Sequence, residues 1–341
     1  MRVAVIGVGL IGGSVGMAAR RRLGAEVLGF DRDAASLELA LERGAIDEAP
    51  ADLAAASDAI DVAVVCVGVG DLAASIAATS RALPGAIVTD VGSVKQGLNA
   101  DPPLPNYIGG HPLAGGEEGG VQHAREDLFE GATWYLTPRS GTTGVLFERL
   151  HRFVAGLGAR PTAIDAAEHD HIMAAMSHLP HVMANVLVGQ AASALGGERT
   201  PATGPSFRDA TRVAGANPAL WAQIYAGNRE SLLAQVDGAL KQLSEVRGLL
   251  AAGADLEPWQ RRAREQRQTL LETGLAGGEL AEVRVGVPNR PGVIADLALS
   301  LGRAGVNIFD MSLSPSSDNQ TGVVAFWVAA GEAQRVRELL A

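Results

Sequence analysis

The chain has 341 residues, of which 47% are hydrophobic and 19% charged, and its net charge is −10. This composition excludes a disordered chain, and the acidic balance argues against nucleic acid, which needs a basic binding face. The length predicts two or three domains. The single cysteine, Cys66, excludes an intrachain disulfide. No apolar run reaches the roughly 20 residues of a membrane span and the N-terminus is unlike a secretory signal, so we expect a cytoplasmic protein without a membrane partner.

Short apolar segments alternate with helix-like segments over residues 1–160. The strands are predicted at Arg2–Ile6, Glu26–Phe30, Val62–Val67 and Ala86–Asp90. The helices are predicted at Leu10–Arg22, Ala34–Arg43, Leu72–Leu83 and Val145–Leu157. This alternation is typical of a parallel sheet covered by helices on both faces. We therefore expect an α/β domain of the Rossmann type over residues 1–160, ending in irregular or antiparallel elements between residues 106 and 138.

A glycine-rich loop, GVGLIG, joins the first strand to the first helix. Its three glycines suit a tight turn, a close approach to a pyrophosphate and helix–strand packing, and the helix N-terminus faces the phosphates. Asp31 ends the next strand, where a carboxylate binds the ribose 2′-hydroxyl and repels a 2′-phosphate. NAD is therefore expected, while the neighbouring Arg32 leaves NADP open. The predicted cofactor-binding residues are Gly7, Gly9, Leu10, Ile11, Gly12, Asp31, Arg32 and Val67.

Two further segments lie where a ligand of this sheet is expected. The segment Asp90–Lys95 follows the fourth strand, and ligands bind beyond the carboxyl ends of parallel strands. Ser93 in it is predicted to orient a catalytic group, contact a substrate hydroxyl or cap the following helix. His111 lies in the loop GGHPLAG, and its ordinary pKa of roughly 6.5 suits a base near neutral pH. His111 is therefore either a proton acceptor for hydride transfer or a turn histidine.

The β pattern disappears over residues 161–274, which we expect to form an all-α domain. Long helices are predicted at Ala166–Leu195, Asn217–Leu250 and Leu256–Leu271. Helical hairpins this rich in Ala and Leu usually bury a face against a partner, so a homodimer is expected. Pro180 should kink the first helix, and Arg212 is a candidate for binding a carboxylate. No metal site is expected, because the histidines of residues 151–181 do not share one ligand face.

The β pattern returns after the helical region, and residues 280–341 are predicted to form a separate small α+β module. Strands are predicted at Glu282–Val287, Asn307–Ser314 and Gly322–Ala329, with helices at Val293–Ala304 and at the C-terminus. A glycine-rich linker, residues 274–279, separates this module from the helical domain.

Over residues 2–250 the chain resembles the prephenate/arogenate dehydrogenase family of tyrosine biosynthesis. The motifs that carry this resemblance are GVGLIG, DVGSVK, GGHPLAGGEEGG, EHD, SHLPH, FRDATR and Trp221. The C-terminal module resembles an ACT domain, an amino-acid-sensing fold. The resemblance implies oxidative decarboxylation of prephenate to 4-hydroxyphenylpyruvate with reduction of NAD. The alternatives are an arogenate dehydrogenase, or a non-catalytic regulator that responds to NAD and amino acids. Hydroxyacid dehydrogenases, which use a catalytic lysine in the helical domain, are disfavoured. The only lysine in the helical region of this chain is Lys241, which lies far along the predicted helices.

The resemblance also implies roles for individual residues. His111 would take the proton of the 4-hydroxyl, with Ser93 steadying both, and Arg212 would hold a substrate carboxylate. The remaining implied substrate-binding residues are Ser177, His181, Trp221, Glu117 and Asp170, the last two as an ionic gate. The histidine that closes SHLPH favours prephenate over arogenate. A tyrosine effector site is expected at Asn289, Gly292 and Asn307.

Overall fold

The computed structural model describes residues 1–53, 60–98, 104–116, 118–139, 142–196, 203–273, 280–288, 310–316 and 320–340, with isolated positions between 289 and 309. The chain divides into two compact units. The first combines Met1–Arg199 with Thr211–Leu240, and the second combines Thr200–Ala210 with Lys241–Ala341. The sequence-predicted catalytic and cofactor residues all belong to the first unit.

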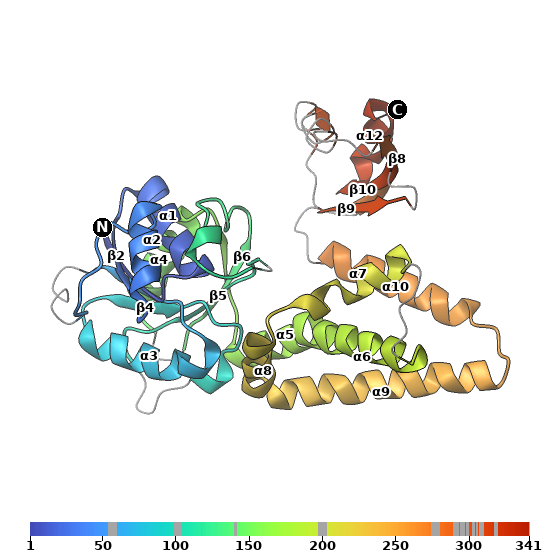
Figure 1. Cartoon of the computed structure of the whole chain (residues 1–341), viewed down its shortest axis with the longest axis horizontal. Helices are drawn as coiled ribbons and strands as arrows, with labels where there is room; N and C mark the ends of the chain where they lie inside the picture. The colour runs from blue at the N-terminus through green and yellow to red at the C-terminus, as the bar shows by residue number, and fades with distance from the viewer. Residues whose placement is uncertain are drawn as a thin grey trace. The chain divides into compact units, whose positions relative to one another are not determined.

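A four-stranded parallel sheet forms the centre of the first unit (Figure 1). Its order is β2-β1-β3-β4, from β1 (Arg2–Ile6), β2 (Glu26–Phe30), β3 (Val62–Val65) and β4 (Ile87–Asp90). Apolar residues of α1 (Leu10–Leu23) and α2 (Ala34–Glu42) pack on one face, and those of α3 (Val69–Ala82) pack on the other. Both β3 and β4 are buried along their whole length; β3 is apolar throughout, and β4 becomes polar only at its carboxyl end, at Thr89 and Asp90. The predicted α/β class is confirmed.

A second sheet continues the first unit beside β4. Its strands are β5 (Gly109–Pro112), β6 (Thr133–Thr137) and β7 (Arg160–Ala163), with α4 (Gly144–Gly156) between the last two. β5 and β6 are antiparallel, which confirms the change of pattern expected there. Backbone pairing of Val88 with Tyr107 joins β4 to the residues before β5. This pairing brings β5, which carries His111, to the carboxyl end of β4.

The next helical stretch is continuous but not uniform. α5 (Ala166–Met173) passes into a π-helical turn (Ala174–His178) and then α6 (Leu179–Ala194). Pro180 lies in the first turn of α6, and a π turn directly precedes that helix; the predicted kink stays a prediction. Within the described residues, this stretch alone is long and apolar enough to cross a membrane by composition, with 22% of its window buried. The sequence analysis expected no such segment, because it looked for an uninterrupted apolar run. An averaged hydropathy window also accepts a segment that polar residues interrupt.

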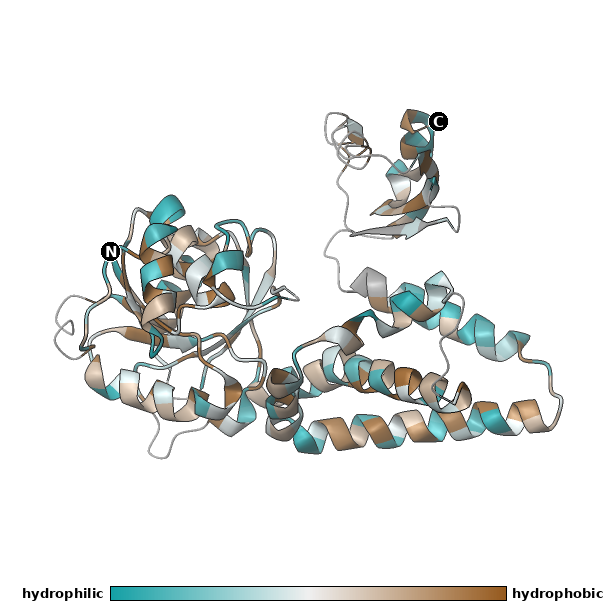
Figure 2. Cartoon of the chain, viewed as in Figure 1, coloured by the Kyte–Doolittle hydropathy of each residue, from teal (hydrophilic) through white to brown (hydrophobic). Residues whose placement is uncertain are grey.

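The remaining helices are α7 (Pro205–Thr211), α8 (Pro218–Gly227), α9 (Arg229–Ala251) and α10 (Glu257–Thr273), with a 3-10 turn at Arg212–Gly215. The single helix predicted for Asn217–Leu250 is wrong, because Asn228 interrupts it. The buried amide of Asn228 bonds Asp170 and His178 instead of continuing the helix surface. Apolar residues colour much of α6 and α9 (Figure 2). Val186 on α6 and Leu233 on α9 are exposed.

The C-terminal module contains an antiparallel sheet of order β8-β10-β9. Its elements are β8 (Leu280–Pro288), β9 (Asp310–Pro315), β10 (Thr321–Ala329) and α12 (Ala333–Leu339). Phe326 and Val336 are among the buried residues that join α12 to the sheet. The α+β class expected for this module is confirmed. The proposed effector residues Asn289, Gly292 and Asn307 lie outside the described residues.

Candidate functional site

The glycine loop between β1 and α1 has two glycines that the fold requires and one that it does not. Gly7 has a φ of 94°, which is strained for any other residue. A Cβ on Gly12 would lie 2.0 Å from the carbonyl oxygen of Gly7. A Cβ on Gly9 would meet no atom within 4 Å. The open space at Gly9 lies at the uncapped N-terminus of α1, which is suited to an anionic ligand.

The other predicted cofactor residues surround this loop. Asp31 follows β2 and accepts hydrogen bonds from the backbone N–H of Val8, at 2.7 Å, and of Asp33, at 3.0 Å. Val67 follows β3 and lies against Gly7. Leu10 and Ile11 form the first turn of α1, half-buried. The sequence prediction therefore selected residues that meet in space.

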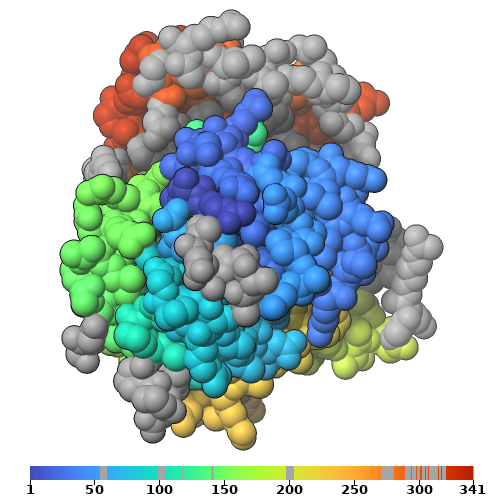
Figure 3. Space-filling view, turned by 90° about the vertical axis from the view of Figure 1, so that its left-hand side faces the viewer, coloured from blue at the N-terminus to red at the C-terminus, as the bar shows by residue number. Residues whose placement is uncertain are grey.

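Acidic side chains accompany Arg32, the residue that left NADP open in the sequence analysis. The side chain of Arg32 is 90% exposed, and its guanidinium lies 3.8 Å from the carboxylate of Asp71. Asp71 is in the first turn of α3, which forms part of the outer surface of the first unit (Figure 3). Arg32 therefore has a carboxylate on each side, Asp31 in sequence and Asp71 in space.

Gly9→Ala should weaken NAD binding at least tenfold and leave the melting temperature unchanged. The added methyl has room in the protein itself but occupies the surface that a pyrophosphate approaches. Titration calorimetry and thermal unfolding measure the two effects. Gly85→Ala is the matched control, because a Cβ there also meets no atom within 4 Å and Gly85 is remote from the loop. Equal NAD affinity in Gly9→Ala and wild type would contradict a pyrophosphate site at this loop.

A buried ion pair fixes the segment after β4. The ammonium of Lys95 donates to Asp90 at 2.6 Å, and both side chains are at most 1% exposed. Asp90 also accepts from the Tyr107 hydroxyl at 2.7 Å and from the backbone N–H groups of Gly92 and Gly110. Burial lowers the pKa of Lys95, and the carboxylate of Asp90 opposes that shift. The pair therefore ties the loop after β4 to β5.

His111 lies at the end of a buried hydrogen-bonded chain. Its Nδ1 is 2.8 Å from Nε2 of His169, and Nδ1 of His169 is 2.8 Å from Oδ1 of Asp170. Asp170 accepts in addition from the backbone N–H groups of Lys95 and Gln96, each at 2.8 Å. Burial, then the positive charge of Lys95, hold the pKa of His111 well below its usual value. His111 is therefore a neutral imidazole near pH 7, as a base must be.

Asp170 does not form the ionic gate that we expected. It is 1% exposed, and its carboxylate is held by two backbone N–H groups and His169. Both of its oxygens already accept hydrogen bonds from these groups. Glu117, the other expected member of the gate, lies outside the described residues. Within the described part of the chain, no hydrogen bond joins Ser93 to His111, so the steadying role of Ser93 stays a prediction.

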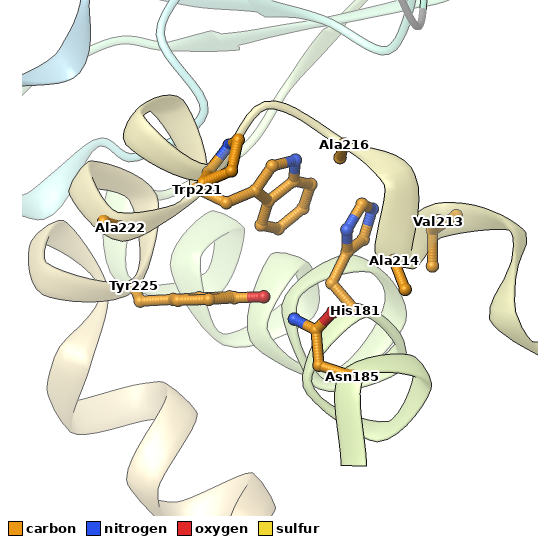
Figure 4. Close-up of a pocket in the computed structure, with 9 residues that line it drawn as sticks. His181, Asn185, Val213, Ala214, Ala216, Trp221, Ala222 and Tyr225 are labelled. Atoms are coloured by element: carbon orange, nitrogen blue, oxygen red, sulfur yellow. The ribbon is translucent and has the colours of Figure 1, made fainter. Parts of the chain in front are cut away.

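A pocket of about 260 Å³ lies between α6, the 3-10 turn and α8 (Figure 4). Trp221 and His181 stack in it, with ring centroids 3.4 Å apart and planes at 20°. The hydroxyl of Tyr225 points toward Asn185 and His181 (Figure 4). The ring of His178 packs edge-on against Trp221, with centroids 6.0 Å apart. Burial lowers the pKa of His178 to about 4. The pocket is thus aromatic, with a few polar groups that could orient a ligand.

The structure also locates the remaining predicted substrate residues. Arg212 is exposed, opens the 3-10 turn that packs on α6, and lowers the pKa of His181, where burial is the larger cause. Ser177 is half-buried in the π turn and does not line the pocket. The sequence analysis missed Asn185 and Tyr225. Each lies four residues after a predicted member of the pocket, and that helical spacing was the available signal.

Comparisons with known proteins agree with this arrangement. Family models match three parts of the chain: the nucleotide-binding domain of prephenate dehydrogenase over residues 15–163, its dimerization domain over 165–263, and an ACT domain over 281–341. The chain is 33% identical to the cyclohexadienyl dehydrogenase of Zymomonas mobilis over 259 residues, which cover 73% of this chain and 88% of that protein. It is 29% identical to the prephenate dehydrogenase of Bacillus subtilis over 338 residues, which cover 94% of this chain and 90% of that protein.

Solved structures give the same result. The prephenate dehydrogenase of A. aeolicus, in complex with hydroxyphenyl propionate and NAD+, superposes with a TM-score of 0.71 at 29% identity, covering 79% of this chain and 98% of that chain. The arogenate dehydrogenase of Synechocystis superposes with a TM-score of 0.68 at 30% identity, covering 81% of this chain and 100% of that chain.

Proposed function

Because the chain belongs to the prephenate dehydrogenase family, we propose that it converts prephenate to 4-hydroxyphenylpyruvate and CO2 with NAD as oxidant. The observation that carries the proposal is the buried, neutral His111 at the carboxyl end of β4. The glycine loop fits NAD, since the open space at Gly9 would take the pyrophosphate and Asp31 the ribose hydroxyls. When bound, NAD supplies the acceptor for the hydride that leaves C4 of the substrate.

His111 acts on the 4-hydroxyl of the substrate. Nε2 accepts the hydroxyl proton, so the oxygen becomes a carbonyl as the C4–H bond breaks. Loss of the C1 carboxylate as CO2 then returns an electron pair through the ring to that oxygen, and His111 gives the proton back to form the phenol. The proton is therefore held during the reaction and not consumed. Aromatisation drives the step, which leaves the protein to position the substrate and supply one base.

The pocket beside α6 and α8 is proposed to hold the side-chain end of the substrate. Prephenate carries two carboxylates, and Arg212 offers a guanidinium next to the His181–Trp221 stack. Ser93 is proposed to hydrogen-bond the substrate hydroxyl, and Ser177 to support the wall near His178.

Arg212→Ala should raise KM for prephenate about tenfold to a hundredfold, with kcat changed much less. The loss corresponds to about 1.5–3 kcal/mol, the typical worth of a hydrogen bond to a charged group. Steady-state kinetics measure both constants. Arg208→Ala is the control, because Arg208 is exposed and one helical turn away. An unchanged KM in Arg212→Ala would remove Arg212 from the substrate site.

We propose a homodimer formed through the helical domain, within domain boundaries of 1–160, 161–274 and 280–341. The exposed apolar residues of α6 and α9 support this, among them Val186, Leu187, Leu233 and Leu240 at 42–56% exposure. Exposed apolar side chains concentrated on two helices favour a protein interface there. The matched dimerization model covers the same segment. The ACT module is proposed to bind an amino acid, tyrosine being the candidate.

Absorbance of NADH distinguishes the candidate activities. Purified protein is mixed with prephenate or arogenate, and with NAD or NADP, in all four combinations. We expect reduction of NAD with prephenate. Activity with arogenate alone would assign the arogenate reaction, which the Synechocystis structure keeps as the second candidate. Absence of activity with both substrates would reject the dehydrogenase assignment and favour a regulator.

A further inference from the structure

The base His111 is not an isolated imidazole, and we infer that His169 and Asp170 form a proton relay behind it. In this relay His169 and Asp170 are positioning residues: they fix which nitrogen of His111 faces the substrate and carry the charge that His111 acquires. The inference rests on the proposed function, because it assigns a role within that reaction. It is carried by the chain His111–His169–Asp170, with two contacts of 2.8 Å between three buried side chains.

The direction of the hydrogen bonds follows from Asp170. An ionised carboxylate only accepts hydrogen bonds, so Nδ1 of His169 must carry a proton. In a neutral His169, Nε2 is then a lone pair that accepts from Nδ1–H of His111. Nε2 of a neutral His111 is consequently left without a proton. The chain therefore presents to the substrate the one nitrogen that can accept the hydroxyl proton.

The surroundings of His111 explain why a relay is useful. Besides burial, the charge of Lys95 after β4 disfavours a second cation at His111. The other titratable groups are His169, Asp170 and His178 from the helical stretch, Asp90 paired with Lys95, and Tyr135 of β6 with its ring 5.6 Å from that of His169. Of the two carboxylates, Asp90 is already bonded to the ammonium. Asp170 is the one available to balance charge on the histidine pair.

The proton movement balances without another reactant. The substrate hydroxyl proton goes to Nε2 of His111, and the proton on Nδ1 of His111 moves to Nε2 of His169. The positive charge then lies on His169, in direct contact with the Asp170 carboxylate. When the phenol forms, both protons return. The two histidines therefore share the proton taken from the substrate.

Asp170 is held rigidly enough for this role. Backbone N–H groups of Lys95 and Gln96 donate to its two oxygens, and the amide of Asn228 donates to its backbone carbonyl at 2.7 Å. These contacts join α5 to the loop after β4, so the relay and the Asp90–Lys95 pair share one backbone segment. A displacement of that loop would change both.

His169→Gln separates the relay from a purely structural role. A glutamine oxygen can still accept from Nδ1–H of His111, but it cannot take a proton and pass the charge toward Asp170. We expect kcat to fall about 10- to 100-fold, within the range of general base effects. KM for prephenate and the Kd for NAD should change less than threefold. The acid limb of the kcat profile should move to lower pH, because the protonated pair loses the stabilisation by Asp170.

His171→Gln is the matched control, since it makes the same substitution on the same helix at an exposed position. Unchanged kcat and an unchanged acid limb in His169→Gln would overturn the relay. NMR of the full-length protein labelled with 15N-histidine tests it without turnover. We expect both His111 and His169 to carry their proton on Nδ1 at neutral pH, and a proton on Nε2 of either would overturn the inference. Because this signal needs no substrate, failure of the relay is distinguishable from absence of prephenate turnover, which would overturn the proposed function.

Discussion

Replacing His111 with Asn lowers kcat by a factor of about 10² to 10⁴ and leaves NAD binding nearly unchanged. An asparagine amide can donate to His169 in place of the imidazole, so the local structure is retained. It has no basic nitrogen, so the 4-hydroxyl proton must leave to water while the C4–H bond breaks. Stopped-flow absorbance of NADH under saturating prephenate measures the loss, and fluorescence titration with NAD reports the binding.

The pH dependence of wild-type activity is a second test of His111 as the base. Since burial holds the pKa of His111 well below 6.5, the base stays unprotonated at pH 7. Activity should be level through neutral pH and fall only on the acid side, at a pH below 6.5. His123→Asn, at a histidine with a 39% exposed side chain, should behave as wild type. Full turnover in His111→Asn would exclude His111 as the base.

Lys95→Met is expected to lower the free energy of unfolding by about 3–5 kcal/mol, the usual cost of leaving one member of a buried ion pair without its partner. Methionine fills the space of the lysine stem, so the loss is mainly electrostatic. The Asp90 carboxylate keeps Tyr107 and two backbone donors, which places the effect toward the lower end of that range. Urea unfolding followed by circular dichroism measures the change.

The other lysine of the chain supplies the control. Lys241 is exposed on α9, so Lys241→Met should change the free energy of unfolding by less than about 0.5 kcal/mol. Equal stability of the Lys95 and Lys241 variants would mean that Asp90 is fully satisfied without the ammonium. Activity of Lys95→Met should also fall, since the loop that holds Asp170 is anchored by the same pair.

Local patterns were sufficient for the parts of the fold in which neighbouring residues decide the structure. The alternation of apolar strands and helices predicted the parallel sheet, and the glycine spacing predicted the turn between β1 and α1. The clash of a Cβ at Gly12 with Gly7, five residues away, is such a local constraint. The change of pattern between residues 106 and 138 also indicated irregular or antiparallel elements, and β5 pairs with β6 antiparallel there.

Contacts between distant segments could not be read in the same way. His111 and His169 are 58 residues apart, and Lys95 and Asp170 are 75 apart. Nothing in the sequence near His169 distinguishes a buried hydrogen-bonded histidine from an exposed one such as His171. The gate role of Asp170 came from the family resemblance. Its burial could not be predicted, because it is set by the loop after β4, which is 75 residues away in the sequence. The interruption at Asn228 likewise depends on partners on α5 and the π turn.

The π turn between α5 and α6 determines which side chains share a side of that helical stretch. In a regular α-helix, twelve residues separate His169 from His181 by about 120° around the axis, whereas one extra residue in the turn reduces this to about 20°. The insertion thus aligns the relay histidine with the histidine that stacks on Trp221. If Ala174–His178 became regular α-helix without a change in its length, every group of α6 would rotate by roughly a quarter of a turn relative to α5. The alignment of the relay histidine with the substrate pocket therefore depends on the width of this one turn as much as on residue identity.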